Sequence, residues 1–141
     1  MPAPLSSLKI LDFSTLLPGP FASKTLADLG AEVLRVETSS RPDITRSLLV
    51  NVQGGLNNHA SLNRSKHSIG LNLKHPEAVK IVNQLVKKYD IVLEQFRPGV
   101  MKRLGLDYKQ LRTQNPSLIF CSLTGYGQTG SYKYRAGHDL N

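Results

Sequence analysis

The chain has 141 residues with 18 Lys or Arg against 10 Asp or Glu, which gives a formal net charge of +8 at pH 7. Cys121 is the only cysteine, so an internal disulfide is excluded and a reducing compartment is expected. Residues 1–25 lack a signal-peptide pattern and no apolar run reaches the length of a membrane span, so we expect a cytoplasmic protein that does not enter a membrane.

The excess of basic residues points to an anionic ligand, with a solvated basic surface as the alternative. Nucleic acid is not favoured, because the basic residues are scattered along the chain and aromatic residues make up only 6% of it. A small molecule that carries phosphate groups fits this composition better.

The first part of the chain has the pattern of a strand, a helix and a second strand. Leu8–Phe13 and Val33–Val36 are short and apolar, as strands buried on both faces are, and Phe21–Leu29 has apolar residues at helical spacing. Pro20 suits the first turn of a helix and Gly30 suits its end. These residues predict a βαβ unit with a right-handed crossover.

The rest of the chain continues this alternation after a long segment, residues 38–65, that we expect to be irregular. That segment has several arginines, so it is either a surface that faces a polyanion or an exposed linker. The elements expected after it are a strand over Ser68–Leu73, a helix over Pro76–Tyr89, a strand over Asp90–Glu94, a short helix after Pro98, a helix over about Asp107–Thr113 and a strand over Leu118–Thr124. Alternating strands and helices predict an α/β domain with a mostly parallel sheet.

Gly125–Gly130 matches the spacing G-x-G-x-x-G directly after the last predicted strand. A dinucleotide site would need a helix to begin there, but residues 131–137 have no helical apolar stripe. We therefore interpret the motif as a flexible glycine loop at the carboxyl end of the sheet, where α/β proteins bind ligands.

Two further places carry chemistry. His138 lies beside Asp139, and a histidine can transfer protons near neutral pH, although a structural role is the alternative. Arg97 and Arg103 flank the start of the short predicted helix, where guanidinium groups suit phosphate; the alternative is two solvated arginines. The histidines and Cys121 lack the paired spacing of metal ligands, so we expect no metal site.

Seven short motifs occur in order along the chain: Leu11–Phe13, Pro18–Ala22, Ala27–Val33, Asn63–Lys66, Phe96–Gly99, Gly125–Gln128 and Gly137–Asp139. Together they resemble the family III CoA-transferases, which include formyl-CoA transferase, carnitine CoA-transferase and α-methylacyl-CoA racemase. The resemblance covers essentially the whole chain. It implies a Rossmann-like domain with an open sheet, helices on both faces and a site for a CoA thioester.

The resemblance also implies which residues bind CoA. Arg97 and Arg103 match arginines that hold its phosphates. The family's arginine or proline after the second strand is Thr38 here, so Arg41 is expected to take its place. The backbone around residues 71–74 is expected to border the adenine. The expected binding residues are Arg41, Leu71, Asn72, Lys74, Arg97 and Arg103.

Two reactions follow from the resemblance. In the transferases an aspartate attacks the thioester and an acyl–aspartate intermediate passes the acyl group on, so that CoA is transferred between carboxylic acids. In the racemases a histidine, which maps onto His138, and that aspartate exchange the proton next to the carbonyl. A third hypothesis is a CoA- or partner-binding module without turnover. In none of these cases do we expect a permanently bound cofactor, because acyl-CoA is a substrate.

Family chains are much longer, and their nucleophilic aspartate lies in a Gly-Asp segment beyond the position of Asn141. We therefore expect residues 1–141 to be the N-terminal part of a CoA-binding domain, without the family's second domain and C-terminal return. Such a part is expected to be inactive alone. Family members are interlocked homodimers, so we expect association with a second copy or with a complementary C-terminal chain.

Overall fold

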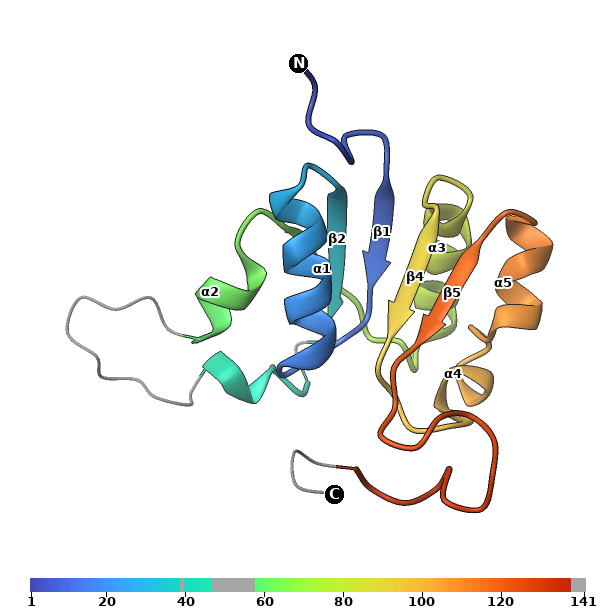
Figure 1. Ribbon diagram of the computed structural model, residues 1–141. Helices are drawn as coiled ribbons and strands as arrows, with labels where there is room; N and C mark the ends of the chain where they lie inside the picture. Colours follow the sequence, from blue (N-terminus) through green and yellow to red (C-terminus); the bar gives the residue numbers. More distant parts are fainter. Residues whose placement is uncertain (39, 47–57, 138–141) are drawn as a thin grey trace.

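The computed structural model describes residues 1–38, 40–46 and 58–137. Its centre is a five-stranded parallel sheet with strand order β3-β2-β1-β4-β5. Figure 1 shows β2, β1, β4 and β5 side by side. The strands are β1 (Lys9–Asp12), β2 (Glu32–Glu37), β3 (His67–Gly70), β4 (Ile91–Glu94) and β5 (Ile119–Ser122). The chain builds outward from β1 to β3 and then returns to place β4 on the other side of β1. The carboxyl ends of β1 and β4 therefore meet at a topological switch point, where open α/β sheets bind ligands.

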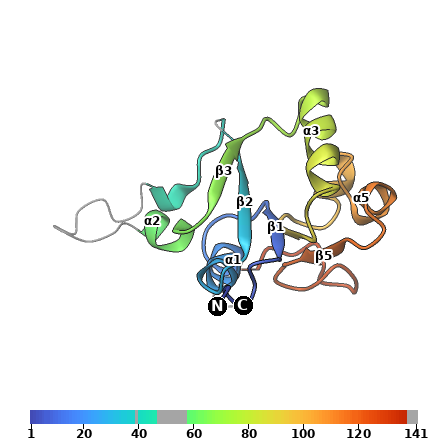
Figure 2. The same cartoon turned by 90° about the horizontal axis from the view of Figure 1, so that it is seen from above.

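Helices cover both faces of the sheet, as expected. Figure 2 shows α1 on one face and α3 and α5 on the other. The helices are α1 (Pro18–Asp28), α2 (Asn58–Asn63), α3 (Pro76–Val86), α4 (Val100–Arg103) and α5 (Tyr108–Gln114), together with a 3-10 turn, η1 (Ile44–Arg46). The prediction of an α/β fold with helices on two sides of a parallel sheet is confirmed.

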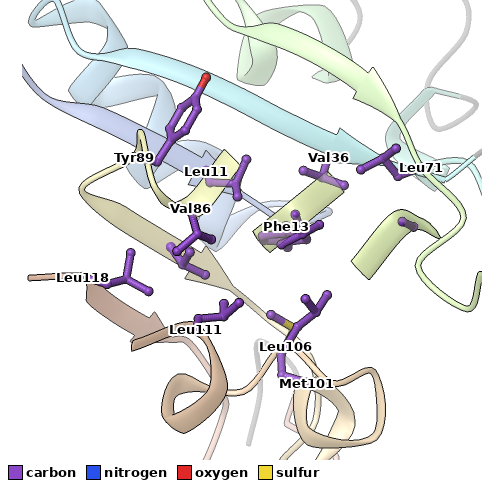
Figure 3. Close-up of a cluster of buried hydrophobic side chains, with 13 residues drawn as sticks. Leu11, Phe13, Val36, Leu71, Val86, Tyr89, Met101, Leu106, Leu111 and Leu118 are labelled. Carbon is purple, nitrogen blue, oxygen red and sulfur yellow. The ribbon is translucent and has the colours of Figure 1, made fainter. Parts of the chain in front are cut away.

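The two faces bury separate apolar clusters, because successive strand residues point to opposite sides. Ile10 packs with Val33 and Ala27 beneath α1, whereas its neighbour Leu11 packs with Val82 and other residues beneath α3. Figure 3 shows the second cluster, the larger of the two, which joins residues of the sheet to residues of α3, α4 and α5. This core holds the carboxyl ends of the central strands in place.

The segment 38–65 is less irregular than its sequence suggests, because it contains η1 and α2. α2 is short, polar and without an apolar stripe, so periodicity does not reveal it. Tertiary contacts stabilise it instead: His59 is buried, and its ring nitrogens lie 3.2 Å from the Thr45 hydroxyl and 3.4 Å from the Arg35 guanidinium. α1 also begins earlier than expected, at Pro18, because both Pro18 and Pro20 fit its first turn.

Within the described ranges, no helix combines the length and apolar character that a membrane crossing needs. The same ranges contain no group of three or more His, Cys, Asp or Glu side chains placed to hold a metal ion.

Candidate functional site

A cavity of about 410 Å³, here called the central cavity, opens at the carboxyl ends of β4 and β5 next to the start of α1. It lies at the same edge of the sheet as the switch point. Its walls come from α1, from the turn after β4 and from the loop after β5. The lining residues are Pro18, Gln95, Phe96, Arg97, Pro98, Leu123, Thr124, Gly125, Tyr126, Lys133, Arg135, Ala136 and Gly137.

The turn after β4 is held by the buried side chain of Glu94. Its Oε2 accepts a hydrogen bond from the backbone N–H of Phe96 at 2.8 Å, and Ser122 on β5 also bonds to the carboxyl. Burial raises the pKa of Glu94 although both hydrogen bonds act in the opposite direction. The carboxyl therefore fixes the backbone that presents Phe96 and Arg97 to the cavity.

The start of α1 packs directly against this turn. The backbone N–H of Gly19 donates a hydrogen bond to Oε1 of Gln95 at 3.1 Å. A Cβ at Gly19 would overlap the Ser14 Cβ and lie 2.8 Å from Gln95 Oε1, so only glycine allows this approach. The wall formed by Pro18 is thus placed by the contact between the Gly19 backbone and the Gln95 side chain.

The glycine loop forms the opposite wall. Residues 125–137 contain turns and bends and no helix, which agrees with our interpretation that the G-x-G-x-x-G motif is not a dinucleotide site. The backbones of Gly125 and Gly137 are in close contact. A Cβ added to Gly125 would lie only 2.8 Å from the Gly137 Cα. The loop brings Lys133 and Arg135 to the central cavity. His138 follows directly but lies outside the described residues, so its role stays a prediction.

A smaller cavity of about 60 Å³, here called the β2–β3 cavity, lies at the carboxyl ends of β1, β2 and β3. Among its lining residues are Arg41, which is exposed, and Leu71, which is buried. Phe96 lines both this cavity and the central cavity, so the two are neighbours along one edge of the sheet.

A buried ion-pair network supports the segment that carries Arg41. The Arg35 side chain is only 2% exposed and pairs through Nη2 with Asp43 Oδ2 and through Nη1 with Glu37 Oε2, the latter at 3.5 Å. Burial acts to raise the pKa of Asp43, but hydrogen bonds from Thr45 and Leu16 and the charge of Arg35 lower it overall. Asp43 therefore stays charged at neutral pH and anchors the chain beside β2.

The structure brings some of the predicted CoA ligands to these cavities and leaves others outside. Arg97 lines the central cavity and Arg41 and Leu71 line the β2–β3 cavity. Arg97 also lines a third cavity, of about 400 Å³, between β4, β5, α4 and α5. Arg103 is exposed on α4 and lines none of these three cavities.

The remaining two predicted ligands, Asn72 and Lys74, are exposed after β3, where Oδ1 of Asn72 accepts the backbone N–H of Lys74 at 3.2 Å. Neither residue lines the three cavities. The contact of these two residues and of Arg103 with CoA therefore stays a prediction.

Sequence reasoning missed three polar residues of the central cavity: Gln95, Lys133 and Arg135. Gln95 could have been found, because it directly follows a predicted parallel strand, and such positions share one edge of the sheet. Lys133 and Arg135 have no comparable signal. They reach the cavity only because the loop returns to it at Gly137.

Comparison with known proteins identifies sequence relatives over nearly the whole chain. The family described as CoA-transferase family III matches residues 5–141. The chain is 43% identical to the succinyl-CoA:glutarate CoA-transferase of Mus musculus over 96% of this chain and 31% of that protein. It is 40% identical to the α-methylacyl-CoA racemase of Homo sapiens over 97% of this chain and 32% of that protein.

Solved structures share the same architecture. A CAIB/BAIF family protein from Brucella suis superimposes with a TM-score of 0.88 at 39% identity, over 99% of this chain and 38% of that chain. A hypothetical protein from Mycobacterium tuberculosis gives a TM-score of 0.87 at 38% identity, over 98% of this chain and 38% of that chain. The chain thus spans about a third of the length of the sequence relatives that it matches.

Proposed function

Because the chain belongs to CoA-transferase family III, we propose that it provides the CoA-thioester-binding part of an enzyme that acts on acyl-CoA. The observation that carries the proposal is the pair of neighbouring cavities at the carboxyl edge of the sheet, with Arg97 at one, Arg41 at the other and Phe96 between them. CoA carries a pyrophosphate and a 3′-phosphate, and guanidinium groups bind phosphate oxygens well. The net charge of +8 favours the same ligand.

In the reaction we favour, CoA moves from one carboxylic acid to another. An aspartate carboxylate attacks the thioester carbonyl carbon, the C–S bond breaks, and the CoA thiolate leaves an acyl–aspartate anhydride. The acceptor carboxylate then attacks the aspartyl carbonyl carbon of this anhydride, and the donor acid leaves as its carboxylate. The CoA thiolate attacks the acceptor's carbonyl carbon in the new anhydride, which gives the acceptor thioester and frees the aspartate carboxylate. That aspartate is expected outside residues 1–141. The similarity to a succinyl-CoA:glutarate CoA-transferase supports this reaction class.

A second candidate is racemisation of the carbon next to the thioester carbonyl, with His138 as one of the two proton-transfer groups. The similarity to α-methylacyl-CoA racemase supports it. The two reactions are distinguished by incubation of the natural full-length protein with a 2-methylacyl-CoA in deuterated water, and separately with succinyl-CoA and glutarate. Deuterium at the α-carbon indicates the racemase, and glutaryl-CoA formation indicates the transferase.

Association with a second copy or a complementary chain is part of the proposal. Large apolar side chains are exposed at the start of α1 and on β5: Leu17 and Phe21 are each 55% exposed and Ile119 is 59% exposed. We infer that a second chain covers part of this apolar surface.

Arg97→Ala tests the CoA-binding proposal directly. We expect this change to weaken acetyl-CoA binding by about 1–3 kcal/mol, because a charged hydrogen bond to phosphate is lost. Calorimetric titration at pH 7 measures the affinity, and Arg41→Ala and Arg103→Ala test the other two sites. Arg112→Ala is the matched control, since Arg112 is exposed on α5 and lines none of the three cavities. Wild-type affinity in all three test variants would contradict the proposed site.

A further inference from the structure

A fully buried polar cluster lies beneath the start of α1, on the side of β1 away from α3. The side chains of Asp12 and Lys66 are 0% and 1% exposed. Oδ1 of Asp12 accepts hydrogen bonds from the backbone N–H and the hydroxyl of Ser14, and its Oδ2 accepts one from the Ser23 hydroxyl on α1. The carboxyl group thus joins the end of β1 to the second turn of α1.

Lys66 adds a third part of the chain, the corner between α2 and β3, to this cluster. Its Nζ lies 3.6 Å from Asp12 Oδ2 and donates hydrogen bonds to the Pro20 carbonyl oxygen at 2.9 Å and to Asn63 Oδ1 at 3.2 Å. The ammonium therefore makes two hydrogen bonds and one ion pair, with oxygens from three parts of the chain. Pro20 is in the first turn of α1, so Lys66 holds that turn directly.

The same turn of α1 forms part of the central cavity. Pro18 lines it, and the Gly19 N–H bonds to Gln95, which also lines it. The glycine packs too closely against Ser14 and Gln95 to move without displacing them. A shift of the first turn would therefore move two walls of the cavity.

We propose that Lys66 is a positioning residue for the central cavity: its ammonium ties the first turn of α1 to the end of β1 and to the α2–β3 corner. It thereby sets where Pro18 and Gln95 lie relative to a bound CoA thioester. This inference rests on the proposed CoA-binding function. A methionine of similar length would fill the space without holding the Pro20 carbonyl or pairing with Asp12. Buried ion pairs of this kind often add little net stability while they specify one arrangement.

The charge of Lys66 can be changed within a useful pH range. Burial lowers its pKa to about 8, although Asp12 favours the charged form. Other charged or titratable groups also face Lys66. They are Arg35 on β2 and Asp43 before η1, together with four groups around a further cavity that Lys66 helps to line: Glu37, Arg46, His59 and His67. The pKa of His59 is lowered, first by burial, and those of Asp43 and Glu37 are lowered overall, so these three keep their charge state above pH 7.

The test compares wild-type protein, Lys66→Met, Lys66→Arg and the control Lys80→Met, all in the natural full-length protein. Lys80 lies exposed on α3 and pairs with Glu77. Acetyl-CoA affinity is measured by calorimetry from pH 7 to 9.5, because acetyl-CoA has no free thiol to titrate. Hydrogen exchange of the Gly19 and Phe21 amides, corrected for the intrinsic effect of pH, is measured without ligand.

We expect Lys66→Met to weaken acetyl-CoA binding at pH 7 by about 10-fold or more, because small displacements of a binding wall are costly. Wild-type affinity for acetyl-CoA should fall toward that of Lys66→Met as the pH rises through 8. Neither Lys66 variant should show this fall. Any pH dependence of affinity that remains in these two variants should be present to the same extent in wild type and in Lys80→Met. The Gly19 and Phe21 amides should exchange faster in Lys66→Met. Lys80→Met should match wild type.

Other outcomes would overturn the inference. It fails if Lys66→Met keeps wild-type affinity, pH profile and exchange rates. If Lys66→Met does not fold, Lys66→Arg is the deciding variant, because a guanidinium stays charged from pH 7 to 9.5. If Lys66→Arg keeps the wild-type dependence of affinity on pH, Lys66 is not the group that causes that dependence. If wild type itself does not bind acetyl-CoA, the proposed function is wrong, and the exchange rates alone still confirm or refute the role of Lys66 at α1.

Discussion

At the scale of single residues, the buried ammonium of Lys66 should make stability depend on pH. Its pKa is 10.5 when exposed and about 8 in the fold, so between these values the unfolded chain binds the proton that the folded chain has lost. Stability therefore rises with pH in this window, by at most about 3 kcal/mol in total. Urea unfolding at pH 7.5 and pH 9.5 should show the rise in wild type, and Lys66→Met should reduce it.

Tyr89 limits this experiment at its alkaline end. Its hydroxyl donates a hydrogen bond to Glu32 Oε1 at 2.9 Å, and burial raises the pKa of Tyr89 to about 12. Between about pH 10 and 12 the unfolded chain loses the phenol proton first, so stability falls with pH there. A rise between pH 7.5 and 9.5 that persists unchanged in Lys66→Met would show that another group causes it.

At the scale of elements, the contact between α1 and the β4 turn depends on Gly19. Replacement of a glycine in a helix with alanine normally stabilises the protein. Here the new Cβ would overlap Ser14 and press on Gln95 at 2.8 Å, so we expect Gly19→Ala to destabilise the protein by about 1–3 kcal/mol. Urea unfolding measures the difference.

Gly70→Ala is the control for this change, because a Cβ at Gly70 on β3 would meet no atom within 4 Å. We expect its effect to stay within about 0.5 kcal/mol, as for most open positions. Equal losses in the two variants would mean that glycine flexibility, and not the close approach of α1, explains the cost. Acetyl-CoA binding should weaken only in Gly19→Ala, since only that residue adjoins the central cavity.

At the scale of the whole molecule, residues 1–141 should bind CoA without completing a reaction. The relatives are about three times as long as this chain, and the aspartate of the proposed mechanism is expected outside it. Expressed as a separate piece, these residues should bind acetyl-CoA but form no glutaryl-CoA from succinyl-CoA and incorporate no deuterium at the α-carbon. The succinyl-CoA:glutarate CoA-transferase of Mus musculus is the positive control for glutaryl-CoA formation. Turnover by the piece that His138→Ala abolishes would refute the mechanism.

The amino-acid sequence by itself determined the alternation of strands and helices, and hence the parallel sheet, because short apolar runs and a helical stripe are local patterns. It also indicated Arg97 as a site residue, since the residues after β4 must lie at the ligand-binding edge of such a sheet. Only the tertiary structure showed α2, whose polar residues have no period of their own and are stabilised by the contacts of His59 with Thr45 and Arg35. Only the tertiary structure joined Lys66 to Asp12, which are 54 residues apart, because a buried charge pair is made by the packing of α1 and not by any local pattern.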